Sequence, residues 1–533
     1  MVIPTLILLL ISCDGFSNKP DDTAHPCGEG THWEDGACVA DTDTAPPEGD
    51  TDTDTDADTD ADTDADTDAD TDADTDADAD ADVGYTGSID LATVGIKLIG
   101  ESSDDQAGDA VAAAGDVNAD GYGDLLIGAK YDDDGGSNAG AAYLVQGPVT
   151  ADVDLSTATA KFIGVEASDQ AGRSVASAGD VNGDGYGDLL IGSSQHDGDG
   201  RHATGAAYLI FGPVSGDLSL TDADAILQGR DASDEAGCSV SSAGDVNGDG
   251  LDDLLIGAEG VDGLGYGSGA AYIVLGPAPR DIRLGAADFE FGGEQSSDQA
   301  GNSVASVGDV DGDGFADVLI GARRAHDGAD SEVGAAYLVL GPPAGDHDLS
   351  SADAKLVGEA VGDCAGHTVS WAGDVDGDGH DDLLVGAYGN DESNSDAGAV
   401  YLVHGPVAGE VSLASAAAKL MGVNAGEELG KVLAGAGDVD ADGRADVLVG
   451  AYRSDTGQAC LFYGAVAGSL TLADADATLE GEDSGSFTGL AVSSAGDVDD
   501  DGHADLLIAA PHDGDGGPDA GLAFLLLFSA ASL

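Results

Sequence analysis

The sequence predicts an all-β fold, a seven-bladed β-propeller of four-stranded blades, and three observations support this prediction. An aspartate-rich loop of the pattern D-x-[DN]-x-D-G-x-x-D occurs seven times, and successive copies start 64, 65, 64, 65, 64 and 59 residues apart. A motif that recurs at such a period indicates a structural repeat. Each loop precedes an apolar run of the LLIG type. The 84 glycines and the 5% of aromatic residues favour short strands with tight turns over a helical globule.

The second repeat illustrates the strands within one unit. Its four strand candidates are residues 160–164 (AKFIG), 174–179 (SVASAG), 189–192 (LLIG) and 205–213 (GAAYLIFGP). An acidic turn at 166–172 separates the first two, and the aspartate-rich loop at 180–188 separates the next two. The LLIG run is continuously apolar, as expected of a strand that is covered on both faces. The SVASAG strand has small side chains, which suit a crowded inner position.

The number of strands indicates that the ring is closed. The GAAYLV-type and KLIG-type strands also occur seven times each, but the first KLIG copy, at 96–100, precedes the first loop. We therefore expect this strand to complete the blade that the C-terminal repeat begins. An open solenoid would instead leave an unpaired strand at each end. The predicted propeller spans residues 85–533.

The N-terminal region predicts export. Residues 1–12 form a short apolar run that resembles a signal peptide, and residues 10–13 resemble the lipobox of bacterial lipoproteins. This resemblance implies that Cys13 carries a lipid and that residues 13–40 are a lipid-anchored N-terminus. The alternative is a signal peptide that is cleaved elsewhere, which would give a secreted protein. Cys27 and Cys38 bracket a short glycine-rich loop and predict a local disulfide, whereas Cys238, Cys364 and Cys460 are expected to be unpaired.

Residues 41–84 are dominated by aspartate alternating with threonine or alanine. Neither face of this alternation is apolar enough to be buried, and the like charges repel, so we expect a disordered, extended stalk. Calcium buffering and glycosylation of the threonines are alternative roles. The whole chain has 104 Asp and Glu against 16 Lys and Arg, a formal charge of −88. Nucleic acid is therefore excluded as a partner, because its recognition needs a basic surface.

The repeats resemble the FG-GAP family. The resemblance rests on a G-x-S-V-A-S-x-G-D segment, the aspartate-rich loop, and a strand that ends in Gly-Ala, as at 128–129, or in Ala-Ala-Pro at 509–511. It covers residues 96–528. FG-GAP repeats form the seven-bladed propeller at the head of integrin α subunits and occur in many secreted bacterial proteins. The resemblance implies this fold and calcium-binding loops, but nothing resembling an integrin leg is present to imply signalling.

Each aspartate-rich loop is a candidate Ca²⁺ site. Positions 1, 3, 5 and 9 offer side-chain oxygens, glycine at position 6 makes the sharp turn, and residue 7 offers its backbone carbonyl. The pattern resembles an EF-hand loop without the bidentate glutamate at position 12, so we expect dissociation constants of ~10⁻⁴ M, as in extracellular modules. The alternative is that some loops are only Asp/Gly turns. The candidate ligands are Asp116, Asn118, Asp120, Tyr122 and Asp124; Asp180, Asn182, Asp184, Tyr186 and Asp188; Asp245, Asn247, Asp249, Leu251 and Asp253; Asp309, Asp311, Asp313, Phe315 and Asp317; Asp374, Asp376, Asp378, His380 and Asp382; Asp438, Asp440, Asp442, Arg444 and Asp446; and Asp497, Asp499, Asp501, His503 and Asp505.

The second polar loops, between the LLIG and GAAYLV strands, vary most between repeats. They are expected on the face opposite the metal loops, and such variation on a rigid frame is typical of binding surfaces. The candidate ligand-binding residues are Tyr131, Tyr266, Arg323, Arg324, Tyr388 and Arg453. The alternative is that these residues lie in solvated turns. His-Asp-Gly triplets recur in three of these loops, with no nucleophile recurring beside them, which favours turn chemistry over catalysis.

The sequence therefore predicts a non-catalytic, calcium-binding adhesion or recognition module. It is expected on the surface of a bacterial-type cell envelope, attached to the membrane through its lipid, with an extracellular protein or glycan as its ligand. One alternative is a structural envelope component that assembles laterally. Another is a hydrolase or lyase that uses the propeller pocket, but this would need a unique polar cluster that does not recur between the repeats, and no such cluster is visible in the sequence.

Overall fold

The computed structural model describes residues 31–34, 37–40, 85–328, 332–345, 347–454 and 456–529. The chain divides into two compact units, Met1–Asp78 and Ala79–Leu533. In the first unit, β1 (Thr31–Glu34) pairs with β2 (Ala37–Ala40) in an antiparallel hairpin. The predicted signal peptide, the lipid on Cys13, the Cys27–Cys38 disulfide and the stalk lie outside the described residues, and only the backbone of Cys38 is described.

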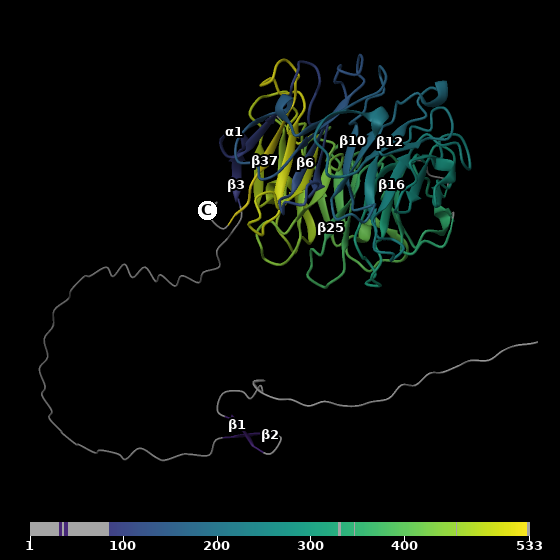
Figure 1. The fold of residues 1–533 in the computed structure, drawn as a ribbon. Coiled ribbons are helices and arrows are strands. Elements are labelled where there is room, and N and C mark those ends of the chain that lie inside the picture. Colours follow the sequence, from purple (N-terminus) through teal and green to yellow (C-terminus); the bar gives the residue numbers. More distant parts are fainter. Residues whose placement is uncertain are drawn as a thin grey trace, which may run out of the picture. The chain divides into compact units, whose positions relative to one another are not determined.

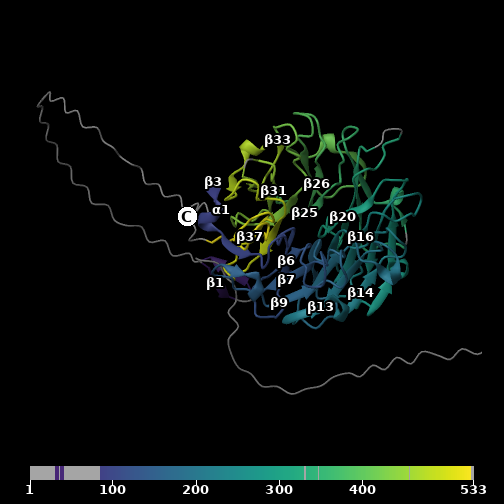
Figure 2. The ribbon, with the colours of Figure 1, turned by 90° about the horizontal axis from the view of Figure 1, so that it is seen from above.

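The second unit is a ring of seven β-sheets, and each sheet contains the four predicted strands as neighbours (Figures 1 and 2). The innermost strands are β5 (Ala110–Gly115), β10 (Ser174–Gly179), β15 (Val240–Gly244), β20 (Ala300–Ser306), β25 (Val369–Gly373), β30 (Leu433–Gly437) and β35 (Val492–Gly496). The second strands are β6 (Asp124–Ala129), β11 (Asp188–Ser193), β16 (Asp253–Ala258), β21 (Val318–Ala322), β26 (Asp382–Ala387), β31 (Asp446–Gly450) and β36 (Asp505–Ala510). The third strands are β7 (Ala141–Val145), β12 (Ala206–Ile210), β17 (Ala270–Val274), β22 (Ala335–Val339), β27 (Ala399–Val403), β32 (Gln458–Phe462) and β37 (Leu522–Leu526). The fourth strands are β9 (Ala160–Ile163), β14 (Ala225–Gln228), β19 (Phe289–Gly292), β24 (Ala354–Val357), β29 (Ala418–Met421), β34 (Ala477–Glu480) and β4 (Ile96–Ile99).

Each sheet also has a short fifth strand that the sequence analysis did not predict. These strands run parallel to the fourth strands. They are β13 (Gly216–Ser219), β18 (Asp281–Arg283), β23 (His347–Asp348), β28 (Gly409–Ser412), β33 (Gly468–Thr471), β3 (Gly87–Asp90) and β8 (Val153–Asp154). Each is only two to four residues long and lacks an apolar alternation, so it carries no strand signal of its own.

A short helical turn follows each fifth strand. These turns are α1 (Leu91–Val94), η1 (Leu155–Thr157), η3 (Leu220–Asp222), η4 (Leu284–Ala286), η5 (Leu349–Ser351), η6 (Leu413–Ser415) and η7 (Leu472–Asp474). Each begins with a leucine that is buried in the core. One more turn, η2 (Gly198–Gly200), lies in a second polar loop. Among the described residues, no helix is long and apolar enough to cross a membrane.

The N-terminal part of the second unit closes the ring, as predicted. Strand β4 pairs with β37 in antiparallel register, so that Leu98 lies opposite Ala523. Strand β3 adds to the preceding blade, parallel to β34. Two successive blades are therefore completed by residues that precede the first repeat, and both views show β3 and α1 beside the C-terminal strand β37 (Figures 1 and 2).

The core of the ring lies between the blades. The second strands, such as β6 and β11, are buried along their whole length, as their continuous apolar runs predict. The innermost strands alternate between buried and half-buried residues. Their small side chains allow seven strands to approach the ring axis, which confirms the inner position predicted for SVASAG.

Candidate metal loops and the opposite face

The seven aspartate-rich loops connect the first and second strands and lie on one face of the ring. The connection that leaves the third strand reaches the same face, because the Gly212 N–H donates to Asp188 Oδ1 at 3.0 Å. The acidic turns and the second polar loops meet on the opposite face, where the Ala171 N–H donates to the Ala139 carbonyl at 2.9 Å. This arrangement is the one expected from alternating hairpins.

The aspartate at position 1 organises each loop. In the fifth loop, Asp374 Oδ1 accepts the N–H of Gly377 at 2.7 Å, and Oδ2 accepts the N–H of Gly379 at 2.9 Å. The aspartate at position 9 is fully buried, and Asp382 accepts the N–H of Gly405 at 2.9 Å. Backbone N–H groups therefore hold the carboxylates of the loop in place.

Oxygen atoms from positions 1, 3 and 9 converge in the loops that have three acidic residues there. In each such group, one carboxylate oxygen per residue lies within 4.8 Å of the others. The groups are Asp309, Asp311 and Asp317; Asp374, Asp376 and Asp382; Asp438, Asp440 and Asp446; and Asp497, Asp499 and Asp505. Position 5 is not part of these groups, and its Oδ1 accepts the N–H of residue 7, as Asp378 does from His380 at 2.9 Å.

In the first three loops, asparagine replaces aspartate at position 3; Asn118 and Asn182 form the same turn, whereas the Asn247 amide donates to Asp253 at 3.5 Å. Asn182 Oδ1 accepts the N–H of Asp184 at 2.9 Å, and Asp376 Oδ1 in the fifth loop accepts the N–H of Asp378 at 3.0 Å. All seven loops thus share one backbone arrangement, although the first three carry one charge fewer.

The chemistry of these loops fits a hard divalent cation. Asp438 Oδ1 and Asp499 Oδ1 are buried and have no hydrogen-bond partner among the residues that the structure describes. Burial, together with the neighbouring carboxylates, raises the pKa of the position-9 aspartates, to about 6 for Asp124 and about 8 for Asp446. Unpaired, converging carboxylates of this kind are stabilised when an ion with oxygen preference binds between them. These acidic clusters could therefore hold metal ions.

The loops also form a continuous belt around the ring. The N–H of position 8 donates to the position-1 carbonyl of the preceding loop, as from Gly187 to Asp116 at 2.9 Å. The bond from Gly123 to Asp497, also 2.9 Å, joins the first loop to the last. Between the fourth and fifth loops, the side chain of Asp381 replaces the backbone and accepts the N–H of Asp309 at 2.9 Å. Each loop is therefore positioned by its neighbours.

The predicted ligand-binding residues all lie on the opposite face, but in two settings. Tyr266 is 82% exposed at the tip of its loop. Arg324 pairs with Glu332, and the Arg453 guanidinium lies 3.0 Å from Glu428. These three side chains reach the surface of the outer loops.

The other three are packed closer to the ring axis. Arg323 lies 2.7 Å from Glu259. The ring of Tyr388 packs edge-on against His367, with centroids 4.6 Å apart. The Lys130 ammonium lies 5.0 Å from the centroid of the Tyr131 ring.

The histidines of the three His-Asp-Gly triplets each lie near an aspartate; two of them join neighbouring loops, whereas His512 lies 3.3 Å from Asp519 of its own loop. His196 Nδ1 lies 3.0 Å from Asp169, and His326 Nδ1 lies 2.8 Å from Asp298. These aspartates belong to acidic turns, not to the histidine's own triplet. The geometry agrees with the structural role that the sequence analysis favoured.

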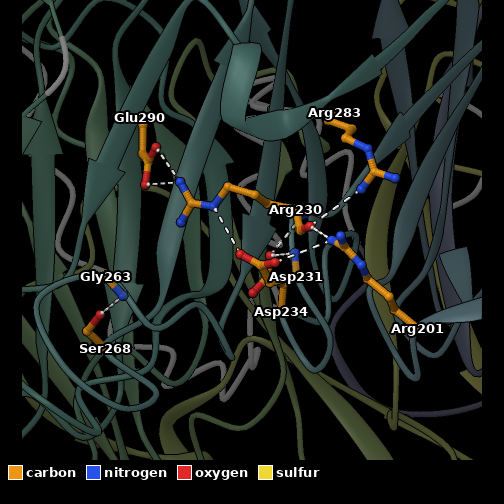
Figure 3. A network of polar contacts seen from close by, with 8 residues as sticks. All are labelled: Arg201, Arg230, Asp231, Asp234, Gly263, Ser268, Arg283 and Glu290. Atoms are coloured by element: carbon orange, nitrogen blue, oxygen red, sulfur yellow. Dashed lines mark hydrogen bonds and ion pairs between the residues drawn. The ribbon is translucent and has the colours of Figure 1, made fainter. Parts of the chain in front are cut away.

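A repeated ion pair joins neighbouring blades on this side of the ring. Lys355 on a fourth strand pairs with Glu294 of the preceding acidic turn at 2.9 Å. One junction reverses the charges, because Arg230 of the acidic turn donates to Glu290 of the fourth strand at 3.1 Å (Figure 3). The junction between Val165 and Ile226 is apolar, and both residues pack against the same core cluster.

The structure also shows a polar cluster that the sequence analysis missed. The residue after the glycine that precedes each innermost strand points toward the ring axis, and it differs in every repeat. These residues are Asp109, Arg173, Cys238, Asn302, His367, Lys431 and Leu490, and all seven line one cavity of about 620 Å³. The expectation that no unique polar cluster exists was therefore wrong. Variation at a single repeat position beside an otherwise constant glycine was the available signal.

Comparison with known proteins agrees with the fold. The FG-GAP repeat family matches five segments, residues 107–145, 171–210, 239–274, 300–339 and 365–403. Integrin alpha-V of Gallus gallus is 32% identical over 226 residues, which is 40% of this chain and 20% of that protein. Integrin alpha-PS2 of Drosophila melanogaster is 32% identical over 176 residues, 31% of this chain and 12% of that protein. Integrin alpha-IIb of Homo sapiens is 36% identical over 170 residues, 31% of this chain and 16% of that protein.

These relatives are much longer, since the chain spans only 12% to 20% of their length. Among solved structures, the WD40 domain of Toxoplasma gondii coronin aligns with a TM-score of 0.46 at 11% identity, over 82% of this chain and 85% of that one. The ring and its loops define a seven-bladed β-propeller built from FG-GAP repeats. Five segments of the chain match FG-GAP repeats, and its seven-bladed propeller is similar to that of integrin α subunits.

Proposed function

We propose that this protein is a non-catalytic recognition module that is stabilised by calcium and displayed outside the cell for adhesion. The integrin α relatives support an exported module of this kind. The converging carboxylates of the metal loops support calcium as the ion, because sites with few carboxylate ligands are filled at extracellular concentrations. Display through a lipid on Cys13 is part of this proposal, and a Cys13→Ser variant should move from the membrane fraction to the soluble fraction.

The observation that carries the proposal is the distribution of exposed apolar side chains. Seven large hydrophobic residues of the described ring are exposed, and five of them lie on the acidic turns or second polar loops: Leu264, Tyr266, Val361, Val423 and Phe487. Two of these side chains share one loop and the other three lie on separate turns of the same face, so this face offers a partner several apolar contacts. This composition favours a protein partner, and a glycan is the alternative.

Arrays of extracellular proteins and of glycans, probed with the full chain in calcium, test the proposal. The variants Tyr266→Ser and Arg324→Ser remove contacts on the outer loops and should abolish binding to any hit. Tyr186→Ser on the metal-loop face is the matched control and should bind like the wild type, because Tyr186 is proposed to use only its backbone carbonyl. Binding that survives both outer-loop changes would place the partner site elsewhere.

A soluble self-association that needs calcium but no foreign partner would instead favour the lateral envelope component. Sedimentation of the wild type at increasing calcium concentration separates the two outcomes. Nucleic acid is not a proposed partner, because the net charge of −88 leaves no extended basic surface.

A further inference from the structure

The cavity at the ring axis, on the face opposite the metal loops, gathers an unusually large share of the protein's few basic side chains. Its lining includes four cationic side chains and two carboxylates, and Glu428 and Glu235 interact with two of the cations from beside it, so this region is close to neutral, whereas the whole chain has a net charge of −88. The four cations are Lys130, Arg173, Arg323 and Lys431. A chain with only 16 basic residues thus places a quarter of them around one cavity.

These cations are neutralised to different degrees. Lys130 lies 2.6 Å from Asp109, and Arg323 lies 2.7 Å from Glu259. Lys431 pairs with Glu428 and also lies 5.0 Å from the centroid of the Tyr388 ring. Arg173 is exposed and lines the cavity; Glu235 interacts with it electrostatically, but no described residue forms a hydrogen bond or close ion pair with its guanidinium. Arg173 is therefore the cation available to a ligand.

Neutral polar groups complete the lining. His367 Nδ1 is buried without a hydrogen-bond partner among the described residues. Burial, together with Arg323 and Lys431, lowers the pKa of His367 to about 3, so its imidazole is neutral and one ring N–H can donate to a ligand. Asn302 is held in place, because its amide donates to the Gly366 and His367 carbonyls at 3.2 and 2.7 Å and its Oδ1 accepts the N–H of Arg323 at 3.0 Å. A free lone pair on Oδ1 can still accept a hydrogen bond from a ligand hydroxyl.

Links between neighbouring blades make the rim of the cavity rigid. The Ser174 hydroxyl donates to the Gly237 carbonyl at 2.9 Å, and the Thr368 hydroxyl donates to the Lys431 carbonyl at 2.7 Å. A site whose frame is fixed before the ligand arrives binds with a smaller loss of entropy. The volume of about 620 Å³ also lies in the range of small-molecule sites.

The cluster fits binding better than catalysis. Burial raises the pKa of the Cys238 thiol to about 12, and this thiol donates to the Gly301 carbonyl, so it is no thiolate nucleophile. The Ser239 and Ser303 hydroxyls accept backbone N–H groups of Val304 and Val369, each at 3.1 Å. Neither hydroxyl is bonded to His367 among the described contacts, so no nucleophile and base are paired here.

We propose that this axial cavity binds a small organic anion, with a carboxylate or phosphate group held by Arg173 and its polar remainder held by Asn302 and His367. Guanidinium groups recognise both oxyanions through paired N–H donors. The volume accommodates a molecule of about monosaccharide to disaccharide size. This site goes beyond the proposed partner surface, because it uses the ring axis and not the tips of the outer loops.

Isothermal titration calorimetry of the full chain in calcium buffer tests the site. The probes are D-glucuronate for a carboxylate, inorganic phosphate for a phosphate, and D-glucose as the neutral control. Binding of either anion without binding of glucose is expected, and the anion that binds identifies the class. The absence of binding heat from both anions at concentrations up to about 10 mM overturns the proposal, because a weaker interaction would gain less than about 3 kcal/mol.

Two variants locate the binding. Arg173→Gln should weaken anion binding about tenfold or more, since a charge-assisted bond is lost. Arg280→Gln removes the same charge from an arginine that is 75% exposed outside the cavity, and it should bind like the wild type. Lys431→Gln is a second cavity variant, and thermal melts confirm that each variant is folded. Wild-type affinity in both cavity variants would overturn the proposal, whereas failure of the Tyr266 array experiment would leave this result unaffected.

Discussion

The two faces of the ring differ in how closely their sequences repeat from blade to blade. On one face, seven loops keep the same glycine at position 6 and the same aspartates at positions 1, 5 and 9. On the other face, the seven equivalent residues at the ring axis are all different. The strands between the two faces are nearly identical in sequence and burial. The difference therefore reflects what each face does, and not a difference in scaffold.

The chemistry of the side chains on each face explains whether its sequence repeats or varies. The metal face concentrates carboxylates that repel one another unless a cation binds, so any repeat that loses its ligands weakens its own site. The belt of hydrogen bonds between loops also needs every loop in the same conformation. The axial face has no such requirement, because the ligand proposed there would contact one unique set of side chains on a rigid frame. Repetition thus marks the face that carries the acidic loops, and variation marks the face that we propose for recognition.

Calcium removal is expected to have the largest effect on stability, because ions are proposed to bind only on the face that carries the aspartate-rich loops. With dissociation constants of ~10⁻⁴ M, ions at ~1 mM stabilise the fold by about 1.4 kcal/mol per loop, and about 10 kcal/mol for all seven. Excess chelator should lower the melting temperature on the order of 10 °C in calorimetry. An unchanged melting temperature would contradict the assignment of these loops as metal sites. Asp109→Asn at the axis is a matched control that should leave the calcium dependence intact.

Deletion of the closing strands should have the next largest effect, because both faces need a closed ring. Removing Tyr85–Gly100 takes away β3, α1 and β4, and leaves two blades with exposed edges that invite aggregation. Removing residues 13–82 should leave the melting temperature unchanged. Light scattering and thermal melts compare the two truncations, and similar behaviour would show that the N-terminal strands do not close the ring.

The sequence was sufficient to predict the parts of the fold that repeat. Seven copies of the loop and of the strands around it predicted the blade number, and the early KLIG strand predicted the closure between β4 and β37. The fifth strands were missed because segments such as Val153–Asp154 are too short to show a period. The axial cavity was missed because residues such as Arg173 and Lys431 lie far apart in sequence and meet only when the ring closes. The metal loops were visible because all their side-chain ligands lie within nine consecutive residues.

Lowering the pH should change the stability of the metal-free ring and of the calcium-loaded ring in opposite directions. The pKa of the position-9 aspartates is raised, to about 6 in Asp317 and about 7 in Asp188, above the value of about 3.9 in an unfolded chain. The folded, metal-free state therefore binds more protons, and its stability should rise as the pH falls from about 8 to about 4. With calcium bound, protons compete with the ion, so the same change should lower stability.

Urea midpoints at pH 8 and pH 5, with calcium and with chelator, measure this reversal. The Asp446→Asn variant should reduce the dependence of the metal-free ring's stability on pH, because the pKa of Asp446 is raised to about 8. Parallel pH profiles with and without calcium would contradict the assignment of position 9 as a ligand.

Charge reversal should have a smaller effect on the blade junctions. The Arg230→Glu variant places a second carboxylate beside Glu290. It should lower the free energy of unfolding by about 1 kcal/mol, because the pair is partly exposed. Adding Glu290→Lys recreates the order seen between Lys355 and Glu294 and should restore most of the stability. A double-mutant cycle from urea unfolding measures the coupling. If the double variant is no more stable than Arg230→Glu alone, the two junctions are not equivalent.

The smallest effect is expected at position 4 of the metal loops, where the backbone is left-handed in every copy. Gly183 has a φ of 74°, which costs glycine little, but Ala119 adopts a φ of 56°, which is strained for a residue with a Cβ atom. Ala119→Gly should relieve this strain and stabilise the ring by up to about 1 kcal/mol. Gly183→Ala should destabilise it by a similar or larger amount, because a Cβ there would also lie 2.8 Å from the Leu251 side chain of the next loop. Urea unfolding of both variants in saturating calcium measures the two effects, and changes of the same sign would mean that the seven loops do not share one backbone requirement.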